Sequence, residues 1–194
     1  MGAVDDVIKS VGVSSTIIRT IGNLSTWLYI SPKGSFLGSR AAYEREAMVP
    51  TDSGIVIGDL VHFANDYFLV VSLFEDRRVS EFFYYKAKLY RCNETITVQA
   101  YNATTKSFAN SNTGIRCLIV SSQAALDSDK GVVIPGFRGS DDVFYLYAQK
   151  SSLSGITKNS ILIDSSLNKL RVGNGINPYF ASGLIEVPVK MEVR

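Results

Sequence analysis

Sulfur and imidazole side chains are scarce in this sequence. Its 194 residues include two cysteines, Cys92 and Cys117, and a single histidine, His62. Two thiols are too few for a four-cysteine zinc site or for a scaffold held by several disulfides. They allow one bridge. Asp5 and Lys9, however, interrupt any apolar segment of a secretory signal peptide. Without secretion into an oxidising compartment we expect two separately buried thiols and no disulfide.

The single histidine also restricts catalysis. Any Ser–His–Asp or Cys–His arrangement would have to use His62, and the sequence has no Gly-x-Ser-x-Gly elbow. His62 lies in an alternating apolar run, which favours a half-buried strand histidine over a catalytic base. The acidic pairs at 127/129 and 141/142 lack the other ligands of a calcium loop. We expect no catalytic residue, no metal and no cofactor; a hydrolase with an unrecognised site is the alternative.

Long apolar runs and a large net charge are absent as well. The longest apolar runs, such as residues 68–71, are far shorter than the roughly 18 residues of a membrane-spanning helix. Twenty Lys and Arg residues against 18 Asp and Glu give a net charge of +2, which by itself does not indicate a polyanionic partner. The hydrophobic fraction of 46 % is sufficient for a core. We expect a folded chain that has no membrane partner.

Short runs of β-branched and aromatic residues are abundant. Gly, Pro, Asn and Asp separate them at intervals of about 8–12 residues. This spacing favours an all-β fold, an antiparallel β-barrel or sandwich with long loops, over a βαβ sheet. No internal repeat is visible in the sequence. The expected strands cover a hairpin at 13–31 and then residues 55–63, 67–74, 82–91, 115–121, 132–134, 143–147, 161–163, 169–172 and 184–193.

The clearest helix signal lies near the N-terminus. Val4, Val7, Ile8 and Val11 have the i, i+3, i+4, i+7 spacing of one helical face. Asp5 and Asp6 lie in the first turn, where the helix dipole favours acids. A short isolated helix is marginal in water, so we expect this apolar stripe to dock on a partner subunit.

The expected domain organisation follows from these elements. Residues 1–53 would form an N-terminal helix, a hairpin and a connecting loop or short helix. Residues 54–194 would form the β-barrel domain, with a loop-rich insertion at about 102–152. Within this insertion, residues 102–114 are polar and rich in turn formers, as in an extended loop or a hairpin tip.

Residues 82–91 combine aromatic and basic side chains. In a strand, Phe83, Tyr85, Ala87 and Leu89 would face the core. The opposite face would carry Tyr84, Lys86, Lys88 and Tyr90. Aromatic and basic side chains on one sheet face are typical of barrels that bind single-stranded nucleic acid. An ordinary solvated face or a subunit interface is the alternative.

A second apolar segment lies in an expected loop. Val132, Val133, Ile134 and Phe137 are more apolar than a free loop should be. This segment either meets another subunit or folds back over its own core.

Several of these residues resemble a known family. The segments 58–61 (Gly-Asp-Leu-Val), 67–72 and 84–93, which ends in Leu-Tyr-Arg-Cys-Asn, resemble the pattern of small neck proteins of tailed bacteriophages. These are the head-closure, or stopper, proteins and the head–tail joining proteins. The closing segments 154–164, 168–172 and 183–192 are similar to the final strands of that family. The resemblance covers about half of the chain, residues 54–101 and 153–194.

The resemblance implies a structural protein of the virion that catalyses no reaction. Such a protein assembles in the bacterial cytoplasm into a homo-oligomeric ring at the head–tail neck, with head-to-tail interfaces between subunits. Its neighbours would be portal or adaptor and tail proteins, with phage DNA in the channel. The ring would close the filled head, join head to tail, or do both. A single-stranded nucleic-acid-binding barrel is the alternative function.

Overall fold

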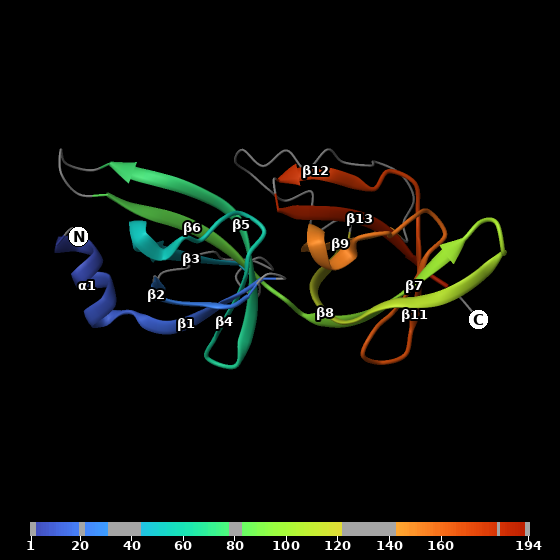
Figure 1. Cartoon of the computed structure of the whole chain (residues 1–194), viewed down its shortest axis with the longest axis horizontal. Coiled ribbons are helices and arrows are strands. Elements are labelled where there is room, and N and C mark those ends of the chain that lie inside the picture. Colours follow the sequence, from blue (N-terminus) through green and yellow to red (C-terminus); the bar gives the residue numbers. More distant parts are fainter. Residues whose placement is uncertain are drawn as a thin grey trace. The chain divides into compact units, whose positions relative to one another are not determined.

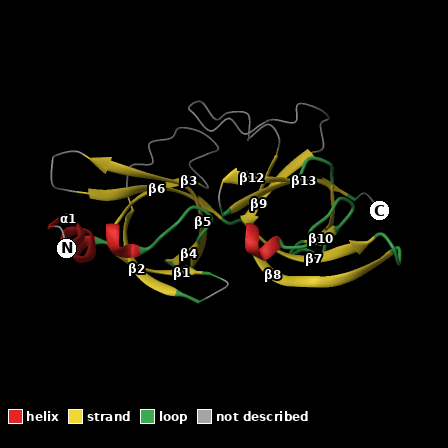
Figure 2. Ribbon diagram, turned by 45° about the horizontal axis from the view of Figure 1, so that its top comes forward, coloured by secondary structure: helices red, strands yellow, loops and turns green. Residues whose placement is uncertain are grey.

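The computed structural model describes residues 3–19, 22–30, 44–77, 83–121, 143–181 and 183–192. The chain divides into two compact units, Met1–Cys92 and Asn93–Arg194 (Figure 1). Strands make up most of the described residues of each unit (Figure 2). All strand pairings are antiparallel, so the expected all-β antiparallel fold with a short N-terminal helix is confirmed.

The first unit is a closed six-stranded barrel. Its strands follow one another around the barrel in the order β1-β2-β3-β6-β5-β4, and β4 pairs with β1 to close it. The helix α1 (Ala3–Val11) precedes β1, and a short 3₁₀ turn, η2 (Thr51–Ser53), follows β3. The strands are β1 (Val13–Ile18), β2 (Leu24–Ile30), β3 (Glu44–Val49), β4 (Leu60–Phe63), β5 (Asp66–Arg77) and β6 (Phe83–Arg91).

The second unit is also closed. Its sheet runs β11-β10-β7-β8-β9-β13-β12, and an additional pairing of β11 with β13 closes a ring of six strands. A 3₁₀ turn, η3 (Lys150–Leu153), follows β9. The strands are β7 (Glu94–Asn102), β8 (Ser107–Ser121), β9 (Val143–Gln149), β10 (Ile161–Ile163), β11 (Lys169–Val172), β12 (Asn177–Ala181) and β13 (Leu184–Met191).

Each barrel has its own apolar core, which alternate residues of the strands supply. In the first barrel the core includes Val70 of β5 and Leu89 of β6, which pair directly. In the second it includes Val172 of β11 and Val189 of β13, which also pair directly. The strand period of two places the intervening side chains on the outer surface of each barrel.

The second barrel repeats the strand connectivity of the first. When β7, β8, β9, β10, β11 and β13 are matched in chain order with β1 to β6, every strand has the same two neighbours in both barrels. β5 is a single strand whose register shifts between Val70 and Ser72, whereas the matching stretch is divided into β11 and β12. The expectation of no internal repeat is therefore wrong at the level of topology.

The repeat extends to individual hydrogen bonds. In the first barrel the Gly58 N–H donates to the Val70 carbonyl at 2.8 Å, and in the second the Asn159 N–H donates to the Val172 carbonyl at 3.0 Å. Gly58 and Asn159 both have positive φ angles, 92° and 70°. Glycine accepts this backbone conformation freely, and asparagine accepts it better than most other residues. Two different residue types therefore form the same turn.

The structure corrects the expected domain boundary. Along the chain, the boundary between the units falls between Cys92 and Asn93 and not at 53/54. The hairpin of β1 and β2 is not an appendage, because β1 pairs with β4 and closes the first barrel. β3 lies within residues 33–53, where a loop or short helix was expected.

Three further expectations differ from the structure. The range 102–152 contains β8 and β9, which are barrel strands that carry the core residues Cys117 and Leu146, so its described parts belong to the barrel and are not an insertion. β4 starts at Leu60 because the residues before it form the turn at Gly58. β5 continues to Arg77, beyond residue 74 where the expected strand ends. The expected strand at 132–134 lies outside the described residues.

Candidate interaction surfaces

The outer face of β6 is covered, although its predicted alternation is correct. Ala87 and Leu89 belong to the core of the first barrel. On the opposite face Tyr84 and Tyr90 are each only 8 % exposed. Base stacking needs an accessible ring face. The expectation that these tyrosines present a nucleic-acid surface is therefore wrong.

The lysines of the same face lie between these tyrosines. Lys88 Nζ pairs with Glu44 Oε1 at 2.9 Å, and the Glu44 side chain is almost fully buried. The Lys88 ammonium also lies 5.8 Å from the centre of the Tyr90 ring. Lys86 is half-buried beside them. The charge of Lys88 thus balances a buried carboxylate of the same barrel, which accounts for its position without a nucleic-acid ligand.

The helix α1 buries one of its expected interface residues within its own unit. Ile8 is only 2 % exposed, and α1 contacts β2, β3 and β6 at one end of the first barrel (Figure 1). Val7 and Val11 are 56 % and 59 % exposed. The expectation that Ile8 meets a partner subunit is wrong, while Val7 and Val11 remain accessible. The side chain of Val4 lies outside the described residues.

Polar contacts fix α1 to η2. The buried Asp5 carboxylate accepts hydrogen bonds from the Thr51 N–H at 3.2 Å and the Thr51 hydroxyl at 3.1 Å. Lys9 Nζ pairs with Asp52 at 2.9 Å, and this hydrogen bond raises the pKa of Lys9. The α1–β1 junction is equally tight, because a Cβ on Gly12 would lie 2.4 Å from the Ile8 carbonyl oxygen.

The second barrel closes the matching end in a different way. Its turn η3 contacts β8, β9 and β13, which are the counterparts of the three strands that α1 contacts. Leu153 of η3 is 2 % exposed and belongs to the core. Both barrels thus have a 3₁₀ turn after their third strand at this end. In the first barrel η2 has no buried residue and α1 is packed there as well, whereas in the second Leu153 of η3 fills the core.

A partly buried ion pair supports the turn before β4. Arg19 Nε donates to Asp59 Oδ1 at 2.6 Å, and the Arg19 guanidinium also donates to Asp59 Oδ2 and to the Gly54 carbonyl. The Val56 N–H donates to Asp59 Oδ2 at 2.8 Å. The hydrogen bond with Asp59 raises the pKa of Arg19. Asp59 therefore has a structural role, as an anchor for β1 and for the turn.

His62 lies where the sequence predicts it. It is half-buried in β4 and stacks on Tyr67 of β5, with ring centres 4.5 Å apart. Cys117 is buried and Cys92 is half-buried, and neither forms a disulfide. The two thiols are therefore separate, as expected, but only Cys117 is buried.

The second barrel carries a buried carboxylate on the outer face of β13. Glu186 is 3 % exposed and accepts a hydrogen bond from the Tyr147 hydroxyl at 2.8 Å. Burial raises the pKa of Glu186, while the hydrogen bonds from Tyr147 and Asn177 act in the opposite direction. Neither Tyr147 nor Glu186 was singled out in the sequence, because an alternating strand pattern does not show that an outward position is covered.

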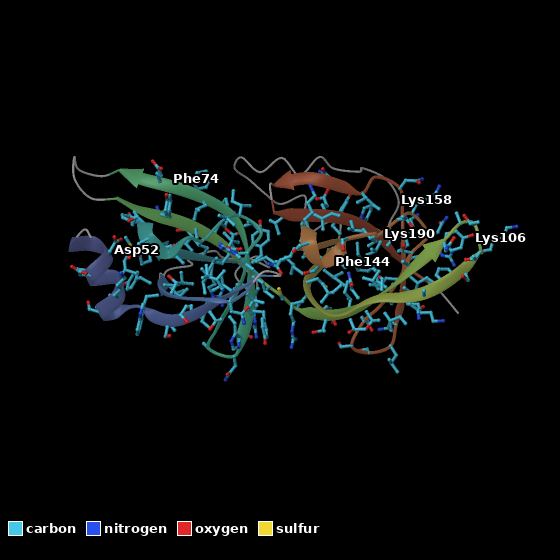
Figure 3. The ribbon with its side chains drawn as sticks, in the orientation of Figure 1. Asp52, Phe74, Lys106, Phe144, Lys158 and Lys190 are labelled. Carbon is cyan, nitrogen blue, oxygen red and sulfur yellow. The ribbon has the colours of Figure 1, made fainter. Side chains whose placement is uncertain are left out.

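The hairpin of β7 and β8 projects beyond the barrel. Residues 102–109 are exposed along its tip, and Lys106 lies at the turn (Figure 3). In the first barrel the matching β1–β2 pairing ends at Ile17 and Leu24, and the counterpart of Ile17 is Val98. β7 and β8 instead continue as far as Asn102. The expected hairpin tip within 102–114 is confirmed, and we call the segment from 99 to 112 the β7–β8 arm.

The β7–β8 arm is ordered by its own contacts. Asn102 Oδ1 accepts hydrogen bonds from the N–H groups of Thr104 and Thr105 at 2.9 and 3.2 Å. The rings of Tyr101 and Phe108 lie 5.2 Å apart across the two strands, and Phe108 is 42 % exposed. The arm therefore presents an aromatic pair on a hairpin with a defined turn.

The Arg-Cys-Asn run of residues 91–93 joins the two units. The Cys92 N–H donates to the Tyr67 carbonyl at 2.7 Å, within the first unit. The Asn93 side chain binds the backbone of Ile119 twice, accepting from its N–H and donating to its carbonyl, each at 2.8 Å. The most specific part of the family resemblance thus falls on residues that end one barrel and begin the next.

The apolar segment Val132, Val133, Ile134 and Phe137 lies outside the described residues. Within the described ranges no group of three or more His, Cys, Asp or Glu side chains could hold a metal ion. In the same part of the chain no helix has the length and hydropathy to cross a membrane. Comparisons with protein-family models, curated proteins and solved structures found no significant match.

Proposed function

We propose that this protein is a structural component of the neck of a tailed-phage virion, where its copies form a ring that closes the filled head, joins it to the tail, or does both. The sequence resemblance at 58–61, 67–72 and 84–93 suggests this role. The β7–β8 arm is the structural observation that supports it best. Copies of the chain, portal or adaptor proteins and tail proteins would be the partners, with DNA in the channel.

The arm has the composition of a contact surface. Lys106 is the one charged residue between 95 and 115, and cores of protein interfaces are depleted in charge and enriched in aromatic residues. Exposed strands in isolated proteins usually carry charges or proline that discourage pairing. A two-stranded hairpin is also only marginally stable in water. An ordered arm with an exposed aromatic pair is therefore well suited to packing on another subunit.

The first barrel supplies an internal comparison. The first barrel closes without an extended hairpin, because the β1–β2 pairing ends at the position that matches Val98, the residue before the arm. The arm is thus not needed to complete a barrel of this topology. Its function is better explained by contacts outside the unit.

Electron microscopy of particles from a phage that encodes this chain, after deletion of its gene, tests the proposed role. We expect heads without tails, and emptied heads would favour closure over joining alone. Intact infectious particles in the absence of the protein would contradict the neck role.

A variant with a shortened arm gives a sharper test. Joining Gln99 to Asn110 through an Asn-Gly turn keeps the ladder register and removes the tip. We expect this variant to fold but to be missing from particles. Lys106→Ala, which keeps the arm length, should be incorporated normally. Normal incorporation of the shortened variant would show that the arm makes no essential contact.

A further inference from the structure

The connection between β11 and β12 contains an Asn-Gly dipeptide, Asn174-Gly175. No other asparagine of the sequence is followed by glycine. Both residues are exposed. Gly175 has a positive φ angle of 87°, which glycine adopts without strain. The dipeptide therefore lies in a turn that is open to solvent.

The two ends of this connection are fixed, whereas its centre is not. On one side the Gly173 N–H donates to a carbonyl of β13 at 2.8 Å. On the other side Asn177 is the ladder partner of Glu186 and hydrogen-bonds to its carboxylate. Between these points, neither the Asn174 side chain nor the Gly175 N–H has a hydrogen-bond partner within the part of the chain that the structure describes. No such contact holds these two groups apart.

Several other asparagines are held in place. The Asn168 side chain donates to Asp164 at 2.9 Å, and the Asn168 N–H donates to the same carboxylate at 2.8 Å. The Asn93 side chain binds the Ile119 backbone twice. Asn102 Oδ1 accepts two N–H groups of its own turn. These side chains must break hydrogen bonds before they can change position, whereas Asn174 has none to break.

The topology of the barrel does not require this connection. In the first barrel the matching stretch of β5 is continuous, with a shift of register between Val70 and Ser72, and Val71 is only 9 % exposed. In the second barrel the four residues 173–176 separate β11 from β12. A chemical change at Asn174 therefore falls in a segment that barrel closure does not depend on.

We propose that Asn174 is a site of spontaneous covalent modification, in which its side-chain amide is lost through a succinimide. The Gly175 nitrogen attacks the side-chain carbonyl carbon of Asn174, and a new C–N bond forms. The bond from that carbon to the amide nitrogen breaks, and this nitrogen leaves as ammonia with the proton of the Gly175 N–H. Water then opens the ring at either carbonyl, which leaves aspartate or isoaspartate at position 174. Water is the only co-reactant.

The residue after the asparagine determines whether the ring can close. Glycine has no Cβ to obstruct the approach of its nitrogen to the side-chain carbonyl, and its backbone is the least restricted. Asn177 lies in the same region but is followed by Pro178, whose nitrogen carries no hydrogen to release. The reaction is therefore assigned to Asn174 and not to Asn177.

The products change the connection in two ways. Replacement of an amide by a carboxylate lowers the formal net charge from +2 to +1. Isoaspartate also directs the main chain through the former side chain, which adds a carbon atom to the backbone between β11 and β12. The modification needs only the folded chain and water, so it is independent of the proposed neck role, and failure of one leaves the other standing.

Incubation of the full chain in warm, mildly alkaline buffer, followed by tryptic digestion and mass spectrometry, tests the proposal. Trypsin cleaves after Arg171 and Lys190, so the site falls in the peptide 172–190. We expect the deamidated form of this peptide to accumulate, and methylation by an isoaspartyl methyltransferase should identify the isoaspartate product. The peptide that contains Asn168 should remain unchanged. A peptide 172–190 that stays unmodified would overturn the proposal.

The same incubation in urea separates the effect of the fold from that of the dipeptide. Because Asn174 is exposed and makes no hydrogen bond, its rate of deamidation in the folded protein should be close to the rate in the unfolded chain. A reaction slower by about tenfold or more in the folded protein would show that local structure protects the site, which would contradict the proposal.

A pair of matched variants assigns the modified residue. Asn174→Gln keeps an amide but moves it too far along the side chain for the same ring to close. Isoelectric focusing should show no acidic species for this variant after incubation. Asn23→Gln, at an exposed asparagine that is followed by leucine, should form the acidic species as the unchanged protein does. Equal amounts in both variants would place the modification elsewhere; circular dichroism checks that both fold.

Discussion

The Asp59 carboxylate and the Ser160 hydroxyl occupy matching places in the two barrels. Asp59 Oδ2 accepts the Val56 N–H at 2.8 Å, and Ser160 Oγ accepts the Thr157 N–H at 3.1 Å. Both side chains are buried. Asp59 differs in also binding Arg19. The same turn is therefore closed by a buried carboxylate that is paired with Arg19 in one barrel and by a hydroxyl in the other.

The two substitutions to alanine should have unequal costs. Asp59→Ala leaves the Arg19 guanidinium without its carboxylate, and the free energy of unfolding should fall by about 3 kcal/mol. Ser160→Ala removes one neutral acceptor and should cost about 1 kcal/mol. Urea unfolding followed by the fluorescence of Trp27 in β2 reports on the first barrel, and circular dichroism reports on both. A larger loss for Ser160→Ala would contradict this comparison.

The contact of Gly12 with the Ile8 carbonyl predicts that Gly12→Ala displaces α1. The added Cβ would lie 2.4 Å from the Ile8 carbonyl oxygen and 2.9 Å from that of Leu28, so the backbone must move. We expect a loss of about 2 kcal/mol, typical of overpacking. Hydrogen exchange of the α1 amides should increase. Ser10→Ala, on the exposed side of the helix, is the control and should change little; unchanged exchange in Gly12→Ala would refute the tight junction.

Glu186 predicts a fall in stability as the pH rises. Burial raises its pKa in the folded protein above the ordinary value of 4.5. Between these two values the folded state binds more protons than the unfolded state, so the free energy of unfolding decreases with increasing pH. Glu186→Gln removes the titration and keeps an acceptor for Tyr147. Thermal unfolding from acid to neutral pH should show the variant gaining relative to the unchanged protein; a constant difference would contradict the assignment.

Val7 and Val11 predict an assembly defect without a folding defect. Both are more than half exposed on α1, so Val7→Ser with Val11→Ser should change stability by less than about 0.5 kcal/mol. If the proposed neck role holds and the helix contacts a neighbouring subunit, the variant should be depleted from particles. Val56→Ser, at a residue 52 % exposed, is the matched control. Equal incorporation of both would place the contact elsewhere.

Much of the strand content could be predicted from the sequence, because alternation is a local property. The inward positions of Ala87 and Leu89 follow directly from it. The low exposure of the opposite face does not follow from alternation, since the burial of Tyr84 and Tyr90 depends on what packs against β6 and not on the sequence of β6 itself. The predicted nucleic-acid face was wrong for this reason.

The repeat could not be recognised from residue identities. Matching positions hold chemically different side chains, such as Leu69 and Arg171 or Asp59 and Ser160. The common feature is the pairing order of strands, which depends on contacts between residues far apart in the chain. The predicted boundary at 53/54 was wrong because the role of β1 appears only when β4 pairs with it.

The order of strands along the chain has a consequence for synthesis. Every ladder partner of β1 to β6 lies before Cys92, so the first barrel is complete in sequence before Asn93 leaves the ribosome. Domains generally fold as units during translation, the N-terminal one first. The first barrel can therefore close while the second is still being made, and neither has to wait for a strand from the other.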